Sequence, residues 1–416
     1  MTIAVTSETR KPSPADEFAR RMPSLALSDP QWVPEVVNVI LQGARDCGAS
    51  DVHLVPDAEG LGMRWRIDGV LHEIGQFPAE MSPRIIARLK VLAQLLTYKT
   101  DVPQEGGIRD GAPENEVRLS TFPTLFGEKA VIRLFHGVRR LTRLGQLGFP
   151  ADALARLRSL LGETGGVIVF TGPAGSGKTT TACACLRELV AMHEGSRSIA
   201  TLEDPIETVI EGASQSQIHA ASGFDLHTAL RSLVRQDPEV IFVGEIRDPQ
   251  VAESVFQAAL TGHLILTTFH AGSAAEGVGR LLDMGIEPYQ LRSGLLAMIS
   301  QRLVRSLCSC SRPSEDPRDL LGLPVERANL PVGCNECRGT GYRERKLLTE
   351  MLVPDRPELR RAILAREDAD TIEQLAVAGG MASLWQAACD AINQGMTSPA
   401  EVRRVLGFRD RGQTKI

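Results

Sequence analysis

The stretch that most constrains the fold is residues 166–181, which read GVIVFTGPAGSGKTTT. Its first six residues are mostly apolar, as in a buried strand, and GPAGSGKT (172–179) fits the pattern G-x-x-x-x-G-K-[ST]. The glycines let backbone N–H groups turn towards one point, and the start of a following helix adds its positive end there. We therefore predict a strand, a phosphate-binding loop and a helix instead of a glycine-rich loop without a ligand.

Strand and helix patterns alternate after this loop. They fall at 198–202, 225–235, 239–244, 249–260 and 263–268. Apolar strands that are separated by helices predict a parallel sheet covered on both faces. The fold class expected is thus α/β, with a P-loop domain at residues 141–305.

The remaining chain divides by pattern into four segments. Residues 1–31, rich in Pro, Ser, Arg and Glu, are expected to form a flexible arm. Residues 32–140 combine helical spacing, alternating strands and an Asp-Gly turn signal, so we predict a small α+β domain. Residues 306–345 carry two cysteine pairs, and residues 346–416 are expected to be a C-terminal helical region.

Composition narrows the classes of function. The net charge is −5 and aromatic residues make up 4% of the chain, so neither a basic field nor base-stacking surfaces favour nucleic acid. The eight cysteines are unevenly spaced, as expected for free thiols in a reducing cytoplasm. The uncharged run at 254–275 is too polar for a membrane span. We expect a cytoplasmic protein that does not bind nucleic acid.

Hydrolysis at a phosphate-binding loop needs a carboxylate near the attacking water. Two acidic clusters follow predicted strands: LEDPIE holds Glu203, Asp204 and Glu207, and IFVGEIRD holds Glu245. Ligands of open α/β sheets bind at the carboxyl ends of the strands. Glu245 is the preferred candidate because it directly follows an apolar strand, whereas Asp204 is either a cap or a catalytic group.

Four ordered motifs, GPAGSGKTTT, LEDPIE, LRSLVRQDPEVIFVGEIRD and LTGHLILTTFHA, resemble those of a known family. They are similar to the P-loop, Asp box, Glu-containing Walker B and His box of the ATPases of bacterial type II secretion and type IV pilus systems. Upstream, SDVHLVP, RWRIDGVL, VPQEGG and VRLSTFPTLFGEKAVIRL resemble the second N-terminal domain of that family. The resemblance covers residues 32–408 and implies a RecA-like P-loop NTPase domain preceded by a small α+β (PAS-like) domain.

The resemblance implies ATP and Mg²⁺ as cofactors and assigns the site residue by residue. The phosphate-binding loop comprises Gly172, Pro173, Ala174, Gly175, Ser176, Gly177, Lys178, Thr179 and Thr180. Within it, Lys178 binds phosphate and Thr179 holds Mg²⁺. Glu245 positions the attacking water, and Glu203 and Glu207 lie close to the metal and the water.

Two histidines, His263 and His270, occupy the His-box positions. Each is either catalytic or a packed or capping residue. His270 follows a predicted strand and is the better candidate for a γ-phosphate sensor.

In this family, arginines from the N-terminal domain reach the phosphates. The candidates are Arg118 and Arg133 and, within the P-loop domain, Arg231, Arg235 and Arg247. Where the family usually shows V-P-Q-D-G-R, this chain reads VPQEGG, so Gly107 stands at the arginine position. Arg109 lies two residues further, on the same face of a strand, and it either substitutes for that arginine or leaves the ATPase weaker.

Two cysteine pairs, Cys308 with Cys310 and Cys334 with Cys337, form a C-x-C and a C-x-x-C motif. Four thiolates suit tetrahedral Zn²⁺. Extension-type members of the family carry two C-x-x-C pairs that bind structural zinc. Because the first pair here is one residue short, the four cysteines either bind zinc through an altered turn or remain free thiols.

The resemblance implies a motor ATPase. It would act as a homo-hexamer, peripheral at the inner membrane through platform proteins, and drive assembly of a pilus or pseudopilus. The alternative is a nucleotide-dependent scaffold of the same apparatus with weak or no turnover. A small-molecule kinase would need an acceptor pocket and a lid, which the sequence does not show, and the acidic charge disfavours a DNA translocase.

Overall fold

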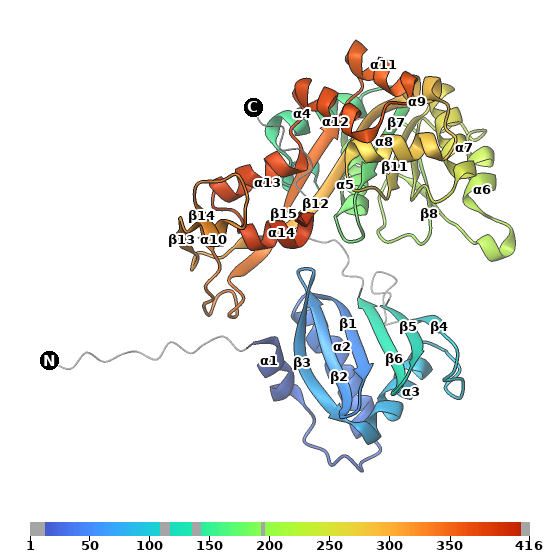
Figure 1. Ribbon diagram of the computed structural model, residues 1–416. Helices are drawn as coiled ribbons and strands as arrows, with labels where there is room; N and C mark the ends of the chain where they lie inside the picture. Colours follow the sequence, from blue (N-terminus) through green and yellow to red (C-terminus); the bar gives the residue numbers. More distant parts are fainter. Residues whose placement is uncertain (1–12, 109–116, 135–142, 193–195, 409–416) are drawn as a thin grey trace. The chain divides into compact units, whose positions relative to one another are not determined.

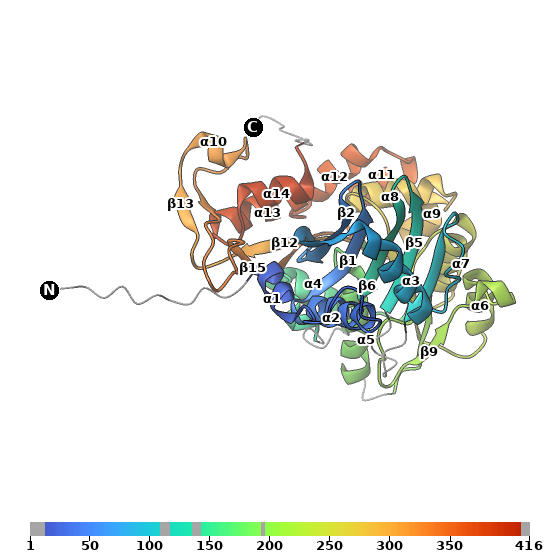
Figure 2. The same ribbon diagram turned by 90° about the horizontal axis from the view of Figure 1, so that it is seen from below.

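The computed structural model describes residues 13–108, 117–134, 143–192 and 196–408 (Figure 1; Figure 2). The chain forms two compact units. Unit 1 contains residues 1–137 together with 308–312 and 331–344, and unit 2 contains the rest. The boundary expected at residue 140 falls in 135–142, outside the described residues.

Unit 1 is built on a six-stranded sheet in the order β3-β2-β1-β6-β5-β4, whose neighbouring strands are antiparallel. Its elements are α1 (Pro14–Arg21), α2 (Trp32–Asp46), β1 (Ala49–Pro56), β2 (Gly60–Ile67), β3 (Val70–Pro78), α3 (Ser82–Leu92), β4 (Gln104–Ile108), β5 (Val117–Thr124) and β6 (Gly127–Leu134). Leu61, Met63 and Trp65 alternate along β2 and are buried in one core with the apolar face of α2. The alternating apolar residues, from which we predicted strands, therefore lie on the face of the sheet that the helices cover.

Helix α1 lies within the segment that the sequence led us to expect as a flexible arm. Ser13 caps it, because the Ser13 hydroxyl accepts a hydrogen bond from the Asp16 N–H. Phe18 is buried and meets Trp65 edge-on, with ring centroids 5.9 Å apart. Phe18 in the core and the Arg21–Asp46 ion pair attach this helix to the domain, and composition alone did not show either contact.

Unit 2 is built on a seven-stranded sheet in the order β15-β12-β7-β11-β10-β8-β9, in which strands β12 to β9 run parallel. The elements up to β12 are α4 (Ala151–Leu161), β7 (Gly166–Thr171), α5 (Lys178–Met192), β8 (Ile199–Glu203), β9 (Ser214–Gln217), α6 (Leu226–Leu233), β10 (Val240–Val243), α7 (Pro249–Leu260), β11 (Leu264–Phe269), α8 (Ala274–Asp283), α9 (Pro288–Gly294) and β12 (Leu295–Leu307).

Helices cover both faces of this sheet, as the continuous apolar strands predict. All of β7 is buried, and its side chains divide between two cores. Val167 and Val169 pack with α6, α7, α8 and α9, whereas Ile168 and Phe170 pack with α4 and α5. The predicted α/β architecture is confirmed, and it places the glycine loop at the carboxyl end of β7, an interior strand between β12 and β11.

The segment after β12 contains β13 (Arg312–Ser314), α10 (Pro317–Leu320), β14 (Ala328–Leu330), β15 (Tyr342–Leu352), α11 (Pro357–Ala365), α12 (Ala369–Ala378), α13 (Leu384–Asn393) and α14 (Pro399–Leu406). Its β15 returns to pair beside β12 at the edge of the large sheet. Within the described ranges, the structure contains no helix that is both long and apolar enough to cross a bilayer.

Candidate functional site

The glycine loop connects the end of β7 to the start of α5. Gly172, Gly175 and Gly177 have φ angles of 143°, 74° and 93°, which side-chain-bearing residues rarely adopt. A Cβ at Gly172 would also lie 2.6 Å from the Gln301 carbonyl oxygen. The path of the loop therefore requires glycine.

Lys178 is buried, and its ammonium group closes the loop from inside. Its Nζ donates to the carbonyl oxygens of Gly172 at 2.8 Å and Pro173 at 3.1 Å. Burial lowers the pKa of Lys178, while the nearby Glu245 carboxylate opposes that shift. The cation is held in the centre of the loop by backbone carbonyls.

The other loop residues differ in exposure. Pro173, Ala174 and Gly175 are exposed, while Thr179 and Thr180 are half-buried in the first turn of α5. Ser176 is buried, and its hydroxyl oxygen has no hydrogen-bond partner within the part of the chain that the structure describes. A buried hydroxyl of this kind carries unused donor capacity inside the loop.

Glu245 and His270 meet beside this loop, although 24 residues, which include α7 and β11, separate them in the sequence. Glu245 follows β10, and His270 follows the neighbouring β11. The His270 Nε2 lies 2.7 Å from a Glu245 carboxylate oxygen, and its Nδ1 lies 3.1 Å from the Gly172 carbonyl oxygen. Both ring nitrogens of His270 thus face an oxygen atom, one on Glu245 and one on the glycine loop.

The Asp box is tied to Glu245 through one arginine. Arg247 Nε donates to Glu245 at 2.8 Å, and a terminal nitrogen of Arg247 lies 3.3 Å from the Asp204 carboxylate. The Arg247 guanidinium is 57% exposed, so solvent screens the attraction and its contribution to stability is small. Arg247 thus links two of the four motifs, while Arg231 and Arg235 lie exposed on and just after α6.

Glu203 is buried at the end of β8 and makes its own contacts. One carboxylate oxygen accepts from the Thr201 hydroxyl at 2.6 Å and from the Gln215 amide at 2.9 Å. Burial raises the pKa of Glu203, although these two hydrogen bonds act in the opposite direction. Glu207 lies on the exposed segment that follows.

His263 has the geometry of a capping residue. Its Nδ1 lies 2.9 Å from the Ala258 carbonyl oxygen and 3.3 Å from the Thr261 hydroxyl, at the C-terminal end of α7. A histidine that satisfies a helix-end carbonyl is explained by the fold. Of the two His-box residues, His270 is the one that the structure brings to Glu245 and the glycine loop.

The two arginines of unit 1 lie on the outer face of its sheet. Arg118 on β5 pairs across the strands with Arg133 on β6 and, on the other side, with Gly107 on β4. A hollow of about 440 Å³ lies over this face, lined by Glu105, Gly106, Gly107, Arg118, Leu119, Ser120, Val131 and Arg133. Arg133 donates to Asp51 at 3.1 Å. Arg109, proposed as a substitute for the missing arginine, lies outside the described residues.

The four cysteines of residues 308–337 form one cluster in unit 1, with their sulfur atoms all within 4.8 Å of one another. The separations are 3.7 Å for Cys308–Cys334, 3.9 Å for Cys310–Cys337 and 3.8 Å for Cys334–Cys337. Four sulfurs around a tetrahedral Zn²⁺ with Zn–S bonds of 2.3 Å are about 3.8 Å apart. The donor set and its spacing therefore fit one zinc ion, and the C-x-C pair reaches the cluster despite its shorter spacing.

Backbone N–H groups also point at the sulfur atoms. Cys337 Sγ accepts from the N–H groups of Cys334 at 3.1 Å and Gly341 at 3.2 Å, and Gly333 donates to Cys310 Sγ at 3.4 Å. Burial would raise the pKa of the Cys337 thiol, but these N–H donors outweigh it and lower the pKa to about 6. Such donors stabilise thiolates, the form that binds metal.

Sequence reasoning missed three residues that hold the site. Gln301 donates from its amide to the Thr181 hydroxyl of α5 at 2.8 Å, and Arg302 donates to the Gly272 carbonyl oxygen at 2.6 Å. The Glu350 carboxylate accepts from the N–H groups of Ala274 and Leu384. The sequence does contain a signal for these residues, because polar side chains stand inside the otherwise apolar strands MISQRLV and LLTEML. Burying such a side chain is costly without a hydrogen-bond partner, so each one indicates a specific buried contact.

Comparison with known proteins agrees with this arrangement. The family model described as type II/IV secretion system protein matches residues 26–404. The chain is 38% identical to the type II secretion system protein E of Xanthomonas campestris, across 97% of this chain and 72% of that protein. It is also 38% identical to the type IV pilus assembly ATPase TfpB of Acinetobacter baylyi, across 90% of this chain and 66% of that protein.

Longer relatives and solved structures extend the comparison. The chain is 35% identical to the type IV pilus assembly ATPase PilB of Thermus thermophilus, of which it spans 45%. Its fold is similar to the Legionella pneumophila ATPase DotB, with a TM-score of 0.66 and 21% identity over 92% of this chain and 97% of that one. The pilus retraction motor PilT with bound ADP gives a TM-score of 0.57 and 25% identity over 88% and 95%.

These matches cover the P-loop, the acidic clusters, the histidine loop and the N-terminal sheet in a single alignment. The chain belongs to the type II/IV secretion system protein family and is an ATPase of the secretion and pilus-assembly type.

Proposed function

We propose that this chain is a motor that couples ATP hydrolysis to the assembly of a pilus or pseudopilus. The observation that carries the proposal is the meeting of Lys178, Glu245 and His270 around the glycine loop. A cation for the phosphates, a carboxylate for the attacking water and a γ-phosphate-facing imidazole are the groups that phosphoryl transfer to water uses.

ATP binding would exchange hydrogen bonds at the loop. Lys178 now donates to Gly172 and Pro173, and the phosphates would replace these carbonyls as its acceptors. The N–H groups of the loop and the start of α5 would contribute further donors. The hydroxyl of Ser176, buried without a partner in the described chain, is available to the same ligand.

Mg²⁺ suits the oxygen donors that the glycine loop and the Asp box carry. The hydroxyl of Thr179 and the carboxylates of Glu203 and Glu207 are hard ligands of the kind that this ion prefers. When bound, the ion would neutralise charge on the phosphates. We propose Thr179 as its direct ligand and the two carboxylates as groups that orient its water shell.

Glu245 would then orient the attacking water. His270 would contact the γ-phosphate, and this contact would change the position of the loop that follows His270. In the structure, Glu245 is engaged by His270 at 2.7 Å and Arg247 at 2.8 Å. A γ-phosphate that draws His270 or Arg247 away would leave Glu245 able to accept from water. The same exchange links nucleotide state to the position of His270.

The assembly proposed is a homo-hexamer, with Arg118 and Arg133 as the phosphate-contacting arginines and structural zinc at the cysteine cluster. The relatives named as pilus assembly ATPases and type II secretion proteins support a role at an inner-membrane platform, reached through protein partners. A location in the cytoplasm, peripheral to that membrane, follows from this role.

Steady-state phosphate release tests the proposal. Lys178→Ala and Glu245→Gln should each lower kcat by roughly a hundredfold or more, as expected for loss of a group that stabilises the transition state. Lys346→Ala and Glu253→Gln, which change exposed residues of unit 2, serve as matched controls and should retain the rate. Equal rates in the wild type and all four variants would contradict ATP hydrolysis at this site. The alternative, a nucleotide-dependent scaffold, would then be favoured.

A further inference from the structure

A short loop connects the catalytic edge of unit 2 to helix α8. It consists of His270, Ala271, Gly272 and Ser273, between the end of β11 and the start of α8. Its first residue contacts the glycine loop and Glu245, as described above. The position of His270 therefore depends on what holds the other end of these four residues.

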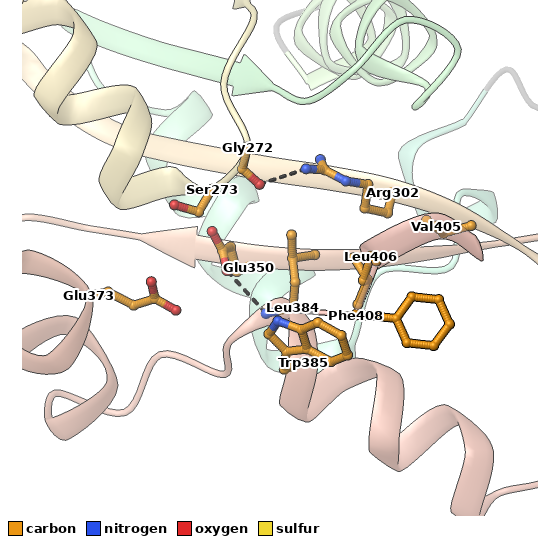
Figure 3. Close-up of a pocket in the computed structure, with 11 residues that line it drawn as sticks. Gly272, Ser273, Arg302, Glu350, Glu373, Leu384, Trp385, Val405, Leu406 and Phe408 are labelled. Atoms are coloured by element: carbon orange, nitrogen blue, oxygen red, sulfur yellow. Dashed lines mark hydrogen bonds between the residues drawn. The ribbon is translucent and has the colours of Figure 1, made fainter. Parts of the chain in front are cut away.

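Two buried charged residues hold that end, and neither belongs to the four motifs. Arg302, on β12, donates to the Gly272 carbonyl oxygen at 2.6 Å (Figure 3). Glu350, on β15, accepts from the Ala274 N–H in the first turn of α8. Arg302 comes from β12 and Glu350 from β15, the edge strand that lies beside β12 in the sheet.

Glu350 makes a second bond that reaches further. Its other carboxylate oxygen accepts from the Leu384 N–H at 3.0 Å, in the first turn of α13. One carboxylate thus bridges the N-terminal ends of α8 and α13, where the helix dipoles favour negative charge. Each of these helices also has its own serine cap, Ser273 and Ser383, so neither needs Glu350 in order to begin.

The burial of this carboxylate argues for a role beyond stability. Glu350 is only 2% exposed, and burial raises its pKa, although the two backbone N–H donors and Arg302 act in the opposite direction. A buried charge is costly unless it is fully bonded, and an apolar residue would fill the same place at less cost. What the carboxylate adds is a fixed distance between two helix ends.

Arg302 connects the same loop to the back of the phosphate-binding loop. Its other terminal nitrogen donates to the Gln301 carbonyl oxygen at 2.8 Å, and a Cβ at Gly172 would lie only 3.1 Å from that nitrogen. A planar guanidinium suits two carbonyls at fixed positions. Gly172 is also the residue whose carbonyl oxygen Lys178 and His270 share.

A cavity of about 280 Å³ lies where these elements meet. Figure 3 shows Arg302 and Gly272 on one side of it, and Glu350, Leu384, Trp385 and Phe408 on the other. Glu373 also lines it. Glu350 thus bridges the two helix ends at the wall of an open space instead of inside a fully packed core.

We propose that Glu350 is a positioning residue for the ATPase reaction: by bridging α8 and α13, it sets where His270 meets Glu245 and couples that contact to the C-terminal helices. Arg302 supports it by fixing Gly272. The inference rests on the role of His270 proposed above.

The test measures kcat and KM for ATP in Glu350→Gln, which keeps the volume but turns one acceptor into a donor that faces the Leu384 N–H. Misplacing a catalytic group by about 1 Å costs up to roughly a hundredfold, so we expect kcat to fall by about tenfold or more, with KM within about twofold. The matched control is Glu253→Gln, which makes the same chemical change at an exposed position of α7 outside this cavity and should leave kcat unchanged.

A double-mutant cycle separates positioning from stability. In a His270→Ala background, Glu350→Gln should have no further effect on kcat, because its effect acts through the imidazole. If Glu350→Gln does not fold, as judged by circular dichroism, Arg302→Lys takes its place in the cycle with the same expectation.

The proposal is overturned if kcat of the Glu350 variant stays within about twofold of wild type, or if the losses multiply in the double mutant. Retention of the wild-type rate by Lys178→Ala would instead overturn the proposed function, so the two failures are distinguishable.

Discussion

In unit 2 the side chains proposed for catalysis hold one another, whereas in unit 1 the arginines proposed to assist them lie on an open sheet face. Lys178, Glu245 and His270 each have two polar contacts with the loop, with each other or with Arg247. Arg133 is 64% exposed and faces a hollow of about 440 Å³. The first group is held by fixed partners, and the second lies beside open space.

This difference suggests a division of labour. A preorganised cluster costs no reordering when the transition state forms, so it suits the chemical step. Long exposed side chains lose rotamer freedom when they bind, so they suit a contact that is made and broken in each cycle. Binding of nucleotide and its hydrolysis should therefore respond differently to substitutions in the two units.

Removing the unit 1 arginines should give the largest effect. We expect the double substitution Arg118→Ala and Arg133→Ala to lower kcat by at least about a hundredfold, because an arginine that neutralises transition-state charge is worth that much or more. Binding of a fluorescent ATP analogue should persist, since Lys178 is intact. Phosphate release and fluorescence titration measure the two quantities.

Arg84→Ala changes an exposed arginine on α3 and is the matched control, expected to keep wild-type kcat. Mixing the arginine double variant with Lys178→Ala protein should restore part of the activity if sites are shared between subunits. A loss below about threefold in the double variant would show that unit 2 hydrolyses ATP without these arginines.

The cysteine cluster should show the next largest effect, on stability. Purified protein should carry one zinc per chain, and Cys337→Ser or removal of metal by a chelator should lower Tm by several degrees, because binding free energy of a structural ion is also folding free energy. Zinc content by atomic emission and thermal unfolding are the measurements.

Cys47→Ser is the control for loss of a thiol outside the cluster, and zinc content should not change in it. If the wild-type protein contains no zinc, or if its Tm is unchanged after chelation, the zinc site is contradicted. The four cysteines would then be free thiols. The sulfur separations of 3.7–3.9 Å are much longer than a disulfide bond of about 2.05 Å, so disulfide formation needs movement.

Gly107 offers a smaller, gain-of-function prediction. Gly107→Arg places a guanidinium on the same face as its cross-strand neighbour Arg118, over the hollow. We expect kcat to rise severalfold at most, since Arg118 and Arg133 already supply charge there and like charges opposite each other partly offset the gain. The readout is phosphate release at saturating ATP.

Gly107→Lys is the comparison for charge alone, and it should give less than the arginine because an ammonium lacks the planar fork that binds phosphate at two points. If neither substitution changes kcat, the arginine position of the family is dispensable in this chain.

A feature could be predicted from the sequence when the residues that define it lie close together in the chain. The strand, loop and helix at 166–192 were predictable because glycine spacing, apolar runs and the lysine lie within one stretch. Glu245 was predictable because it directly follows a buried strand. Glu350 and Arg302 were not, because their meaning comes from β12 and β15 pairing at the edge of the sheet, a contact between segments far apart in the chain. The same limit hid α1, whose place depends on Phe18 reaching Trp65.

Glu203 gives the smallest effect and tests whether a preorganised carboxylate carries a stability cost. Burial raises its pKa above the unfolded value of about 4.3, so the folded protein retains the proton to higher pH than the unfolded chain does. Below about pH 4 both states are protonated and no cost arises. As pH rises through the interval between the two pKa values, the unfolded chain ionises first and stability falls, and above the folded pKa the cost is constant.

Glu203→Gln should therefore raise Tm by about 2 °C at pH 8, a shift on the order of 1 kcal/mol for a domain of this size, and the gain should disappear near pH 4. The same substitution should lower kcat, because the amide cannot replace a carboxylate near the metal. Thr201→Val, which removes a hydrogen bond that favours the ionised form, should shift Tm in the opposite direction at pH 8. A gain in Tm that is equal at both pH values would assign the effect to packing, and Glu203 would then belong with the residues that the fold alone explains.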